Sequence, residues 1–74
     1  MKTDYLKFVM WSDEDNVFVG YCPDLFIGGA CHGRDEKKVY AELCQLVEDE
    51  VRNRKRRKQP LPPREAIVAH AIAV

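Results

Sequence analysis

The N-terminal half of the chain contains three short apolar runs whose side chains can be assigned alternately to two faces. The runs lie at residues 5–11, 17–21 and 26–32, and they are rich in aromatic and β-branched side chains. Alternation with a period of two is typical of strands that bury one face. An acidic stretch separates the first two runs, and a Pro-Asp pair, which cannot continue a β-ladder, separates the next two. The pattern therefore predicts three short strands.

The hydrophobic period lengthens in the middle of the chain. Apolar residues then recur at spacings of three and four, which aligns them as one stripe of a helix. The stripe consists of Val39, Leu43, Leu46, Val47 and Val51. Asp35 precedes it, and an aspartate there can accept hydrogen bonds from the free amides of a first helical turn. We predict a helix from Glu36 to about Arg56, ended by the proline-rich segment 59–63.

The last segment, residues 67–74, is short and has apolar side chains at both odd and even positions. We interpret it as a final strand. The predicted order is β-β-β-α-β. This is an α+β fold with a three-stranded antiparallel meander, a C-terminal strand and one long helix packed on one sheet face. Residues 1–74 make one domain, and chains this small bury only about 60% of their unfolded surface. We therefore expect a homo-oligomer, as a dimer or a larger assembly.

Pairing the first two strands across the acidic loop, with Trp11 opposite Val17, assigns the side chains to two faces. The face expected to receive the helix holds Leu6, Phe8, Met10, Phe18, Cys22, Ile27 and Cys31. One helix cannot cover both faces, and the apolar patch left on the other face is typical of a partner surface. Its predicted contacts are Tyr5, Val9, Trp11, Val17, Val19 and Tyr21. Trp11 and Tyr21 are the expected anchors, because interface energy concentrates in large aromatic side chains.

Charge is balanced overall but segregated along the chain. The 12 basic and 12 acidic residues cancel, so no global field attracts nucleic acid or membranes. A basic run nevertheless follows the predicted helix stripe, and its candidate nucleic-acid contacts are Arg52, Arg54, Lys55, Arg56, Arg57 and Lys58. Cations at a helix C-terminus also complement the helix dipole. We favour this structural role, with nucleic-acid contact and docking to an acidic partner as alternatives.

Several short stretches carry a family resemblance. They are Trp11-Ser12 before the acidic hairpin, Cys22-Pro23-Asp24-Leu25, His32-Gly33 and Asp35-Glu36-Lys37-Lys38-Val39. Together with the prolines of segment 60–63, they resemble the HicB family of bacterial and archaeal antitoxins over about residues 5–63. Phe26-Ile27 stands where that family usually has Pro-Gly, and the helix opening lacks the usual paired glutamates.

The resemblance implies a degenerate ribonuclease-H-like sheet in a non-catalytic protein. Such proteins block a small ribonuclease toxin of the HicA type, which cleaves mRNA, by binding to it. The family usually carries a separate DNA-binding module after this core. In a chain that stops at Val74 we expect no such module, and we interpret the protein as a solitary HicB-like domain.

The residue types of catalytic and metal sites are present but poorly placed for such chemistry. A ribonuclease-H-like site needs several carboxylates around divalent ions, and here the acidic residues are expected in a loop tip and a turn. A zinc site from Cys22, Cys31, His32 and His70 is disfavoured, because neighbours on a strand project to opposite faces. Three cysteines without a C-x-x-C motif are instead predicted to be buried free thiols. We expect no enzyme activity, no metal and no cofactor.

The sequence also bears on location. No apolar run approaches the roughly 20 residues that a helix needs to span a bilayer. The N-terminus lacks the apolar core of a secretion signal. We therefore expect no membrane contact and a cytoplasmic protein.

Overall fold

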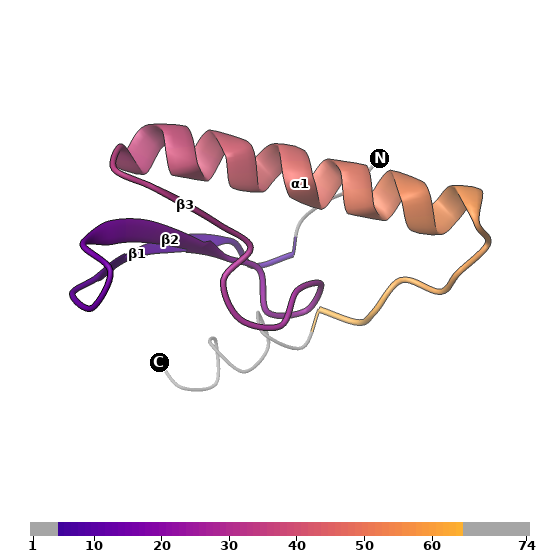
Figure 1. Cartoon of the computed structure of the whole chain (residues 1–74). Coiled ribbons are helices and arrows are strands. Elements are labelled where there is room, and N and C mark those ends of the chain that lie inside the picture. Colours follow the sequence, from indigo (N-terminus) through magenta and orange to yellow (C-terminus); the bar gives the residue numbers. More distant parts are fainter. Residues whose placement is uncertain (1–4, 65–74) are drawn as a thin grey trace.

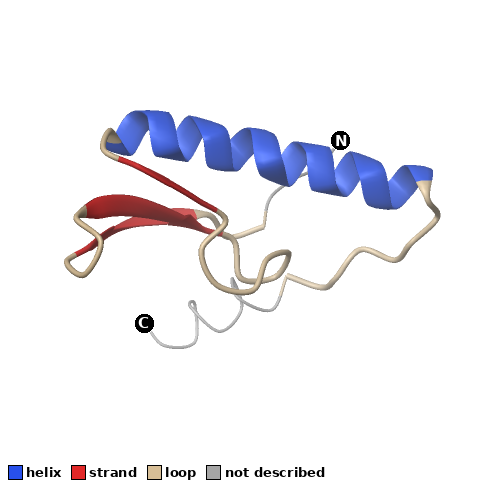
Figure 2. Ribbon diagram, viewed as in Figure 1, coloured by secondary structure: helices blue, strands red, loops and turns tan. Residues whose placement is uncertain are grey.

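A computed structural model describes residues 5–64 of the 74-residue chain, so the predicted C-terminal strand at 67–74 lies outside the described residues. The elements are β1 (Phe8–Ser12), β2 (Val17–Tyr21), β3 (Cys31–Gly33) and α1 (Glu36–Arg56) (Figure 1). The strands form one antiparallel sheet in the order β1-β2-β3. The helix lies along one face of this sheet (Figure 2). The α+β prediction, with a meander followed by one long helix, is confirmed for these residues.

The predicted helix is confirmed at both ends. Its N-cap is Asp35, whose carboxylate accepts a hydrogen bond from the backbone amide of Lys38 at 3.1 Å. This satisfies one of the amides that have no partner inside the first turn. Four residues of the predicted stripe are buried, namely Val39, Leu43, Val47 and Val51, and Leu46 is partly buried beside them. Within residues 5–64, no helix combines the length and the apolar character that crossing a membrane requires.

Two glycines let the helix lie close to the sheet. A Cβ atom added to Gly20 would lie 3.0 Å from the Sγ of Cys31 and 3.4 Å from the side chain of Leu43. A Cβ atom added to Gly33 would lie 3.1 Å from a methyl group of Val39. The spacings to Cys31 and Val39 are tighter than ordinary van der Waals contact, and the spacing to Leu43 is at its lower limit, so side chains of the helix stripe lie directly against the sheet backbone at both glycines. This contact forms the centre of the core.

A second part of the core joins the two ends of the described chain. Tyr5 is only 7% exposed, and its hydroxyl donates a hydrogen bond to the carbonyl of Pro62 at 2.5 Å. Leu61 packs against the same cluster. The segment after α1 therefore returns from the helix end toward the loop between β2 and β3 (Figure 1). Tyr5 was predicted as a surface contact, and that prediction is wrong because the side chain is part of the core.

The C-terminus of α1 is closed by a Schellman motif. The amide of Gln59 donates to the carbonyl of Arg54 at 2.8 Å, and the amide of Lys58 donates to that of Lys55 at 3.2 Å. This motif places the residue after the C-cap in the left-handed region, where glycine is the usual choice. Here the position is taken by Lys58, with φ 59°. A side chain with a Cβ atom costs about 1–2 kcal/mol in that conformation.

We expect Lys58→Gly to stabilise the protein by about 1 kcal/mol, because glycine adopts this conformation without the steric cost of a Cβ atom. Urea unfolding followed by circular dichroism measures the difference. The matched control is Arg57→Gly, since the C-cap Arg57 has φ −85° and gains nothing from glycine. Equal effects of the two substitutions would contradict this explanation.

Candidate interaction surface

The β1–β2 hairpin is paired one residue away from the predicted register. Trp11 lies opposite Phe18, and Ser12, rather than Trp11, lies opposite Val17. The turn therefore has four residues, and it is closed by the amide of Asn16, which donates to the carbonyl of Ser12 at 2.8 Å. Asn16 adopts φ 55°, a left-handed conformation that asparagine tolerates better than most residues. Because side chains alternate along a strand, this slip of one residue moves every β1 side chain to the opposite face.

The register corrects two further predicted contacts. Val9 and Trp11 pair with Gly20 and Phe18, and Gly20 faces the helix, so both side chains lie on the helix side of the sheet. Val9 packs against the core there. Trp11 contacts Phe18 edge-on, with ring centroids 5.1 Å apart, and its indole N–H donates to Asp13 at 2.9 Å. Trp11 is still 48% exposed, but it cannot anchor the opposite face.

The face of the sheet turned away from α1, which we call the open face, combines predicted and unpredicted residues. Its side chains are Phe8, Met10, Ser12, Val17, Val19, Tyr21 and His32. Val17, Val19 and Tyr21 lie where they were predicted. Phe8 and Met10 were assigned to the helix side, and the correct register brings them here. The rings of Phe8 and Tyr21 stack with centroids 5.1 Å apart, and Met10 is 57% exposed.

A broad hollow of about 720 Å³ opens beside β2 and β3. Val17, Val19 and Tyr21 contribute its apolar lining, and the hairpin residues Glu14 and Asp15 contribute carboxylates. The hollow therefore combines apolar surface with negative charge at one end. A partner that carries both apolar and cationic side chains fits this combination.

The loop between β2 and β3 forms one wall of the hollow. The predicted third strand began at residue 26, but β3 begins only at Cys31, because the loop residue Gly28 adopts φ 73°. Gly29 lies against Val19 so closely that an added Cβ atom would be 2.6 Å from a methyl group. Ile27, predicted to point inward, is instead fully exposed at the surface of this loop.

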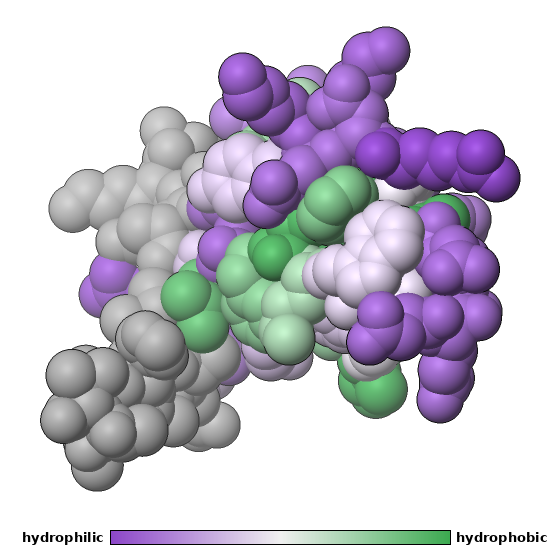
Figure 3. Space-filling model, turned by 90° about the vertical axis from the view of Figure 1, so that its left-hand side faces the viewer, coloured by the Kyte–Doolittle hydropathy of each residue, from purple (hydrophilic) through white to green (hydrophobic). Residues whose placement is uncertain are grey.

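Apolar surface also reaches the end of the molecule that carries the hairpin tip and the start of α1. Seen from this end, an apolar area lies in the middle of the view, between hydrophilic side chains (Figure 3). The charged residues Asp13, Glu14 and Asp15 of the hairpin turn are all exposed. Exposed apolar surface with a charged rim is the usual composition of a protein–protein interface.

The cysteines follow the prediction of free thiols. Cys22 and Cys31 are buried, Cys44 is half-buried on α1, and all three are unpaired. The Cys31 thiol donates a hydrogen bond to the carbonyl of Val39 at 3.5 Å. Burial raises the pKa of the Cys31 thiol, and the charge of Glu42 raises it further. Among residues 5–64, no three histidine, cysteine or acidic side chains gather in a way that could hold a metal ion.

We expect the free energy of unfolding to fall as the pH rises above 9. Burial raises the pKa of both Cys22 and Cys31 from an ordinary value of 9.0, so the unfolded chain ionises first. The stabilisation is therefore complete below that pH and is lost as the pH rises through the folded pKa values. Urea unfolding at a series of pH values measures the slope. The variant Cys22→Ala/Cys31→Ala should reduce the slope but not abolish it, because burial also raises the pKa of Tyr5 and Tyr40 from an ordinary value of 10.0. A flat wild-type profile would contradict this assignment.

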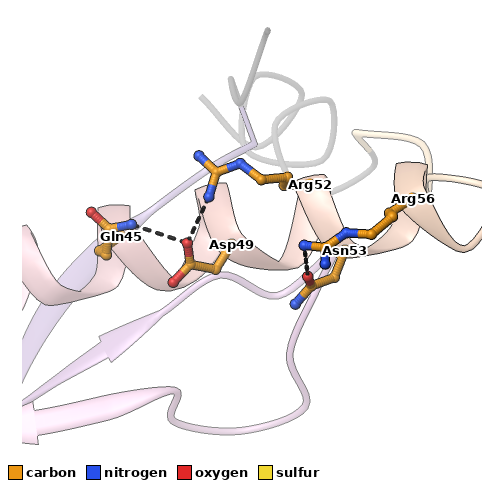
Figure 4. Close-up of polar contacts among 5 residues, drawn as sticks. All are labelled: Gln45, Asp49, Arg52, Asn53 and Arg56. Carbon is orange, nitrogen blue, oxygen red and sulfur yellow. Dashed lines mark hydrogen bonds and ion pairs between the residues drawn. The ribbon is translucent and has the colours of Figure 1, made fainter.

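The predicted nucleic-acid contacts divide into two groups on α1. Arg52 is paired with Asp49 at 3.2 Å, and Arg54 is paired with Glu50 at 2.6 Å. Asp49 also accepts from Gln45, so the Arg52 contact belongs to a small polar network along the helix (Figure 4). The second group lies at the helix end and consists of Lys55, Arg56, Arg57 and Lys58, all of which are exposed. The structure therefore brings four of the six candidates together without a carboxylate partner among the described residues.

No protein-family model, no curated protein and no solved structure matches this chain.

Proposed function

We propose that this chain is a non-catalytic, HicB-like binding protein that neutralises a small mRNA-cleaving toxin of the HicA type by covering it. The observation that carries the proposal is the open face. One side of the sheet is buried by α1, while the other presents aromatic and aliphatic side chains without a covering element among the described residues. The sequence resemblance to HicB antitoxins supports the same function.

The open face has the composition that protein partners use. Phe8 and Tyr21 form a stacked pair, and Met10 beside them is largely exposed. Aromatic residues and methionine are enriched in interface cores, where a few of them contribute most of the binding energy. The carboxylates of Glu14 and Asp15 at the hollow suit a partner with a basic surface. Occlusion requires no chemistry from this chain, only a surface that covers the partner's active site.

The same architecture favours self-association in the cytoplasm. Met10 and Trp11 are exposed on β1, which is an edge strand of the described sheet. An apolar edge strand is a template for pairing with another chain, so we include a homo-oligomer in the proposal. Buried free thiols also fit a reducing compartment.

The experiment that tests the proposal is capture of the partner from native cell extract with the tagged chain at moderate salt. We expect one small basic protein at stoichiometric yield, because a contact dominated by apolar area resists salt. After release, that protein should cleave RNA. An adjacent reading frame that encodes it would support the assignment.

The matched control for this capture is the tagged variant Met10→Glu, which places a charge on the open face. It should retain little of the partner. The proposal would be wrong if wild type retained no stoichiometric protein, or if the captured protein showed no action on RNA.

A further inference from the structure

We propose that the C-terminal end of α1 is a second binding surface, which takes the phosphate backbone of nucleic acid independently of the open face. The surface consists of Lys55, Arg56, Arg57 and Lys58, and we call it the basic cap. It lies at the far end of the helix from the hairpin tip (Figure 1).

The charges of the basic cap are available. All four side chains are exposed, and none has an acidic partner among residues 5–64. Within that range, the only side-chain hydrogen bond of the four is the one that Arg56 donates to the side-chain carbonyl oxygen of Asn53 at 3.0 Å. By contrast, the carboxylates of Asp49 and Glu50 neutralise the two preceding arginines, Arg52 and Arg54.

Complementing the helix dipole explains only half of this surface. Lys55 and Arg56 lie in the last turn, where cations stabilise the helix. Arg57 is the C-cap and Lys58 follows it, so both lie at or beyond the end of the helix. Lys58 moreover occupies the left-handed position at which glycine would be more stable. The helix end alone therefore does not require a lysine at position 58, and the charge of Lys58 adds to that of its three neighbours.

The zero net charge of the chain does not cancel the local field. The exposed acidic residues Asp13, Glu14 and Asp15 lie in the hairpin turn of a molecule that is 38 Å long. Glu48, the exposed acidic residue nearest to the cap along α1, lies seven residues before Lys55, or about 10 Å along the helix axis. Charges separated by more than the Debye length, about 10 Å at 0.1 M salt, are largely screened from each other. A polyanion near the basic cap therefore meets four positive charges.

The chemistry of the cap specifies its ligand. Residues 52–60 contain no aromatic side chain on which a base could stack. Contacts are therefore made to phosphates and carry no sequence preference. Four neutralised phosphates predict that log K falls with log salt at a slope of about −3.6 for duplex DNA and about −2.8 for single strands. Binding is weak, and it depends steeply on salt.

The test measures fluorescence anisotropy with a labelled DNA duplex and a labelled single-stranded RNA over a salt series. In the variant Lys55→Gln/Arg57→Gln/Lys58→Gln, the slope of log K against log salt should fall by about three quarters. Its affinity at low salt should be at least about tenfold lower than that of wild type. The matched control is Arg34→Gln/Lys37→Gln/Lys38→Gln, which removes the same charge from exposed positions at the start of α1. We expect this control to change the affinity less than twofold.

Equal losses in the two triple variants would overturn the proposal, because binding would then depend on net charge alone. The proposal would also be overturned if poly-glutamate displaced the labelled nucleic acid from the wild-type protein more readily than unlabelled RNA does. That result would favour an acidic protein ligand. Lys58→Gly, which relieves the backbone at that position, should still weaken nucleic-acid binding. The variant Lys55→Gln/Arg57→Gln/Lys58→Gln should still capture the protein partner at moderate salt as well as wild type does. The basic cap and the open face are thereby tested separately.

Discussion

Replacing Leu43 with alanine is expected to lower the free energy of unfolding by about 2–5 kcal/mol, the usual range for a leucine in a close-packed core. Leu43 is completely buried and faces Gly20 of β2, where an added Cβ atom would lie 3.4 Å from its side chain. Native domains of this length have a total stability of only about 4–11 kcal/mol. The variant should therefore unfold at much lower urea concentration than wild type, as measured by circular dichroism.

The matched control is Leu46→Ala, which removes the same atoms from the same helix. Leu46 is only partly buried at the edge of the core, so its loss leaves a smaller cavity and a smaller effect. Equal effects of the two variants would contradict the observed docking of α1, because they would mean that the helix presents a different stripe to the sheet.

Replacing Met10 with glutamate is expected to weaken binding to the captured partner about 30-fold or more, because the proposal makes Met10 one of the few interface residues whose loss costs at least about 2 kcal/mol. The side chain is 57% exposed on the open face and opposite Val19. An exposed charge there leaves the core intact, so the unfolding curve should stay close to that of wild type. Isothermal titration calorimetry with the purified partner measures the affinity.

Two controls make this result specific to the open face. Ala41→Glu adds the same charge on the exposed outer side of α1 and should leave the affinity unchanged. Trp11→Ala alters the neighbouring β1 residue, which lies on the opposite face against Phe18. It should reduce stability more than affinity. If Trp11→Ala lowered the affinity for the partner more than Met10→Glu did, the assignment of the two side chains to opposite faces would be wrong.

The helix could be predicted from the sequence because several independent local signals agree. Val39, Leu43, Val47 and Val51 repeat at helical spacing, and Asp35 caps the first turn through a contact between near neighbours. Each signal depends on residues within one or two turns of each other. Such information is present in a short window of sequence, and tertiary packing then only confirms it.

The faces of β1 could not be predicted in the same way. Five of its residues, Phe8 to Ser12, are apolar or small, so their alternation gives little preference for either face. The register depends instead on the turn, where Asn16 takes a left-handed conformation and closes a four-residue loop. A loop longer by one residue reverses every assignment, which is why the anchor was placed at Trp11 and Met10 was assigned to the core.

Long-range contacts account for the other differences. Tyr5 is buried because its hydroxyl meets Pro62, which is 57 residues away in the chain. The loop before β3 contains Gly28 at φ 73° and Gly29 in close contact with Val19, and the strand that was predicted to begin at residue 26 begins only at Cys31. The partner of Tyr5 lies far outside any local window, whereas Val19 and Gly29 are ten residues apart and meet because the loop between β2 and β3 folds back on β2. Val17, Val19 and Tyr21 were placed correctly because they share one parity of β2, the central strand, and Gly20 of the other parity faces the helix.

The most direct test of the central claim is an RNA-cleavage assay of the captured partner, titrated with the purified chain. Occlusion by the open face predicts that the rate of RNA cleavage falls linearly as the chain is added. The rate should reach zero at a fixed molar ratio of chain to partner. Met10→Glu should fail to inhibit at the same concentrations, while Ala41→Glu inhibits like wild type. Full cleavage by a partner that is saturated with wild-type chain would contradict the account.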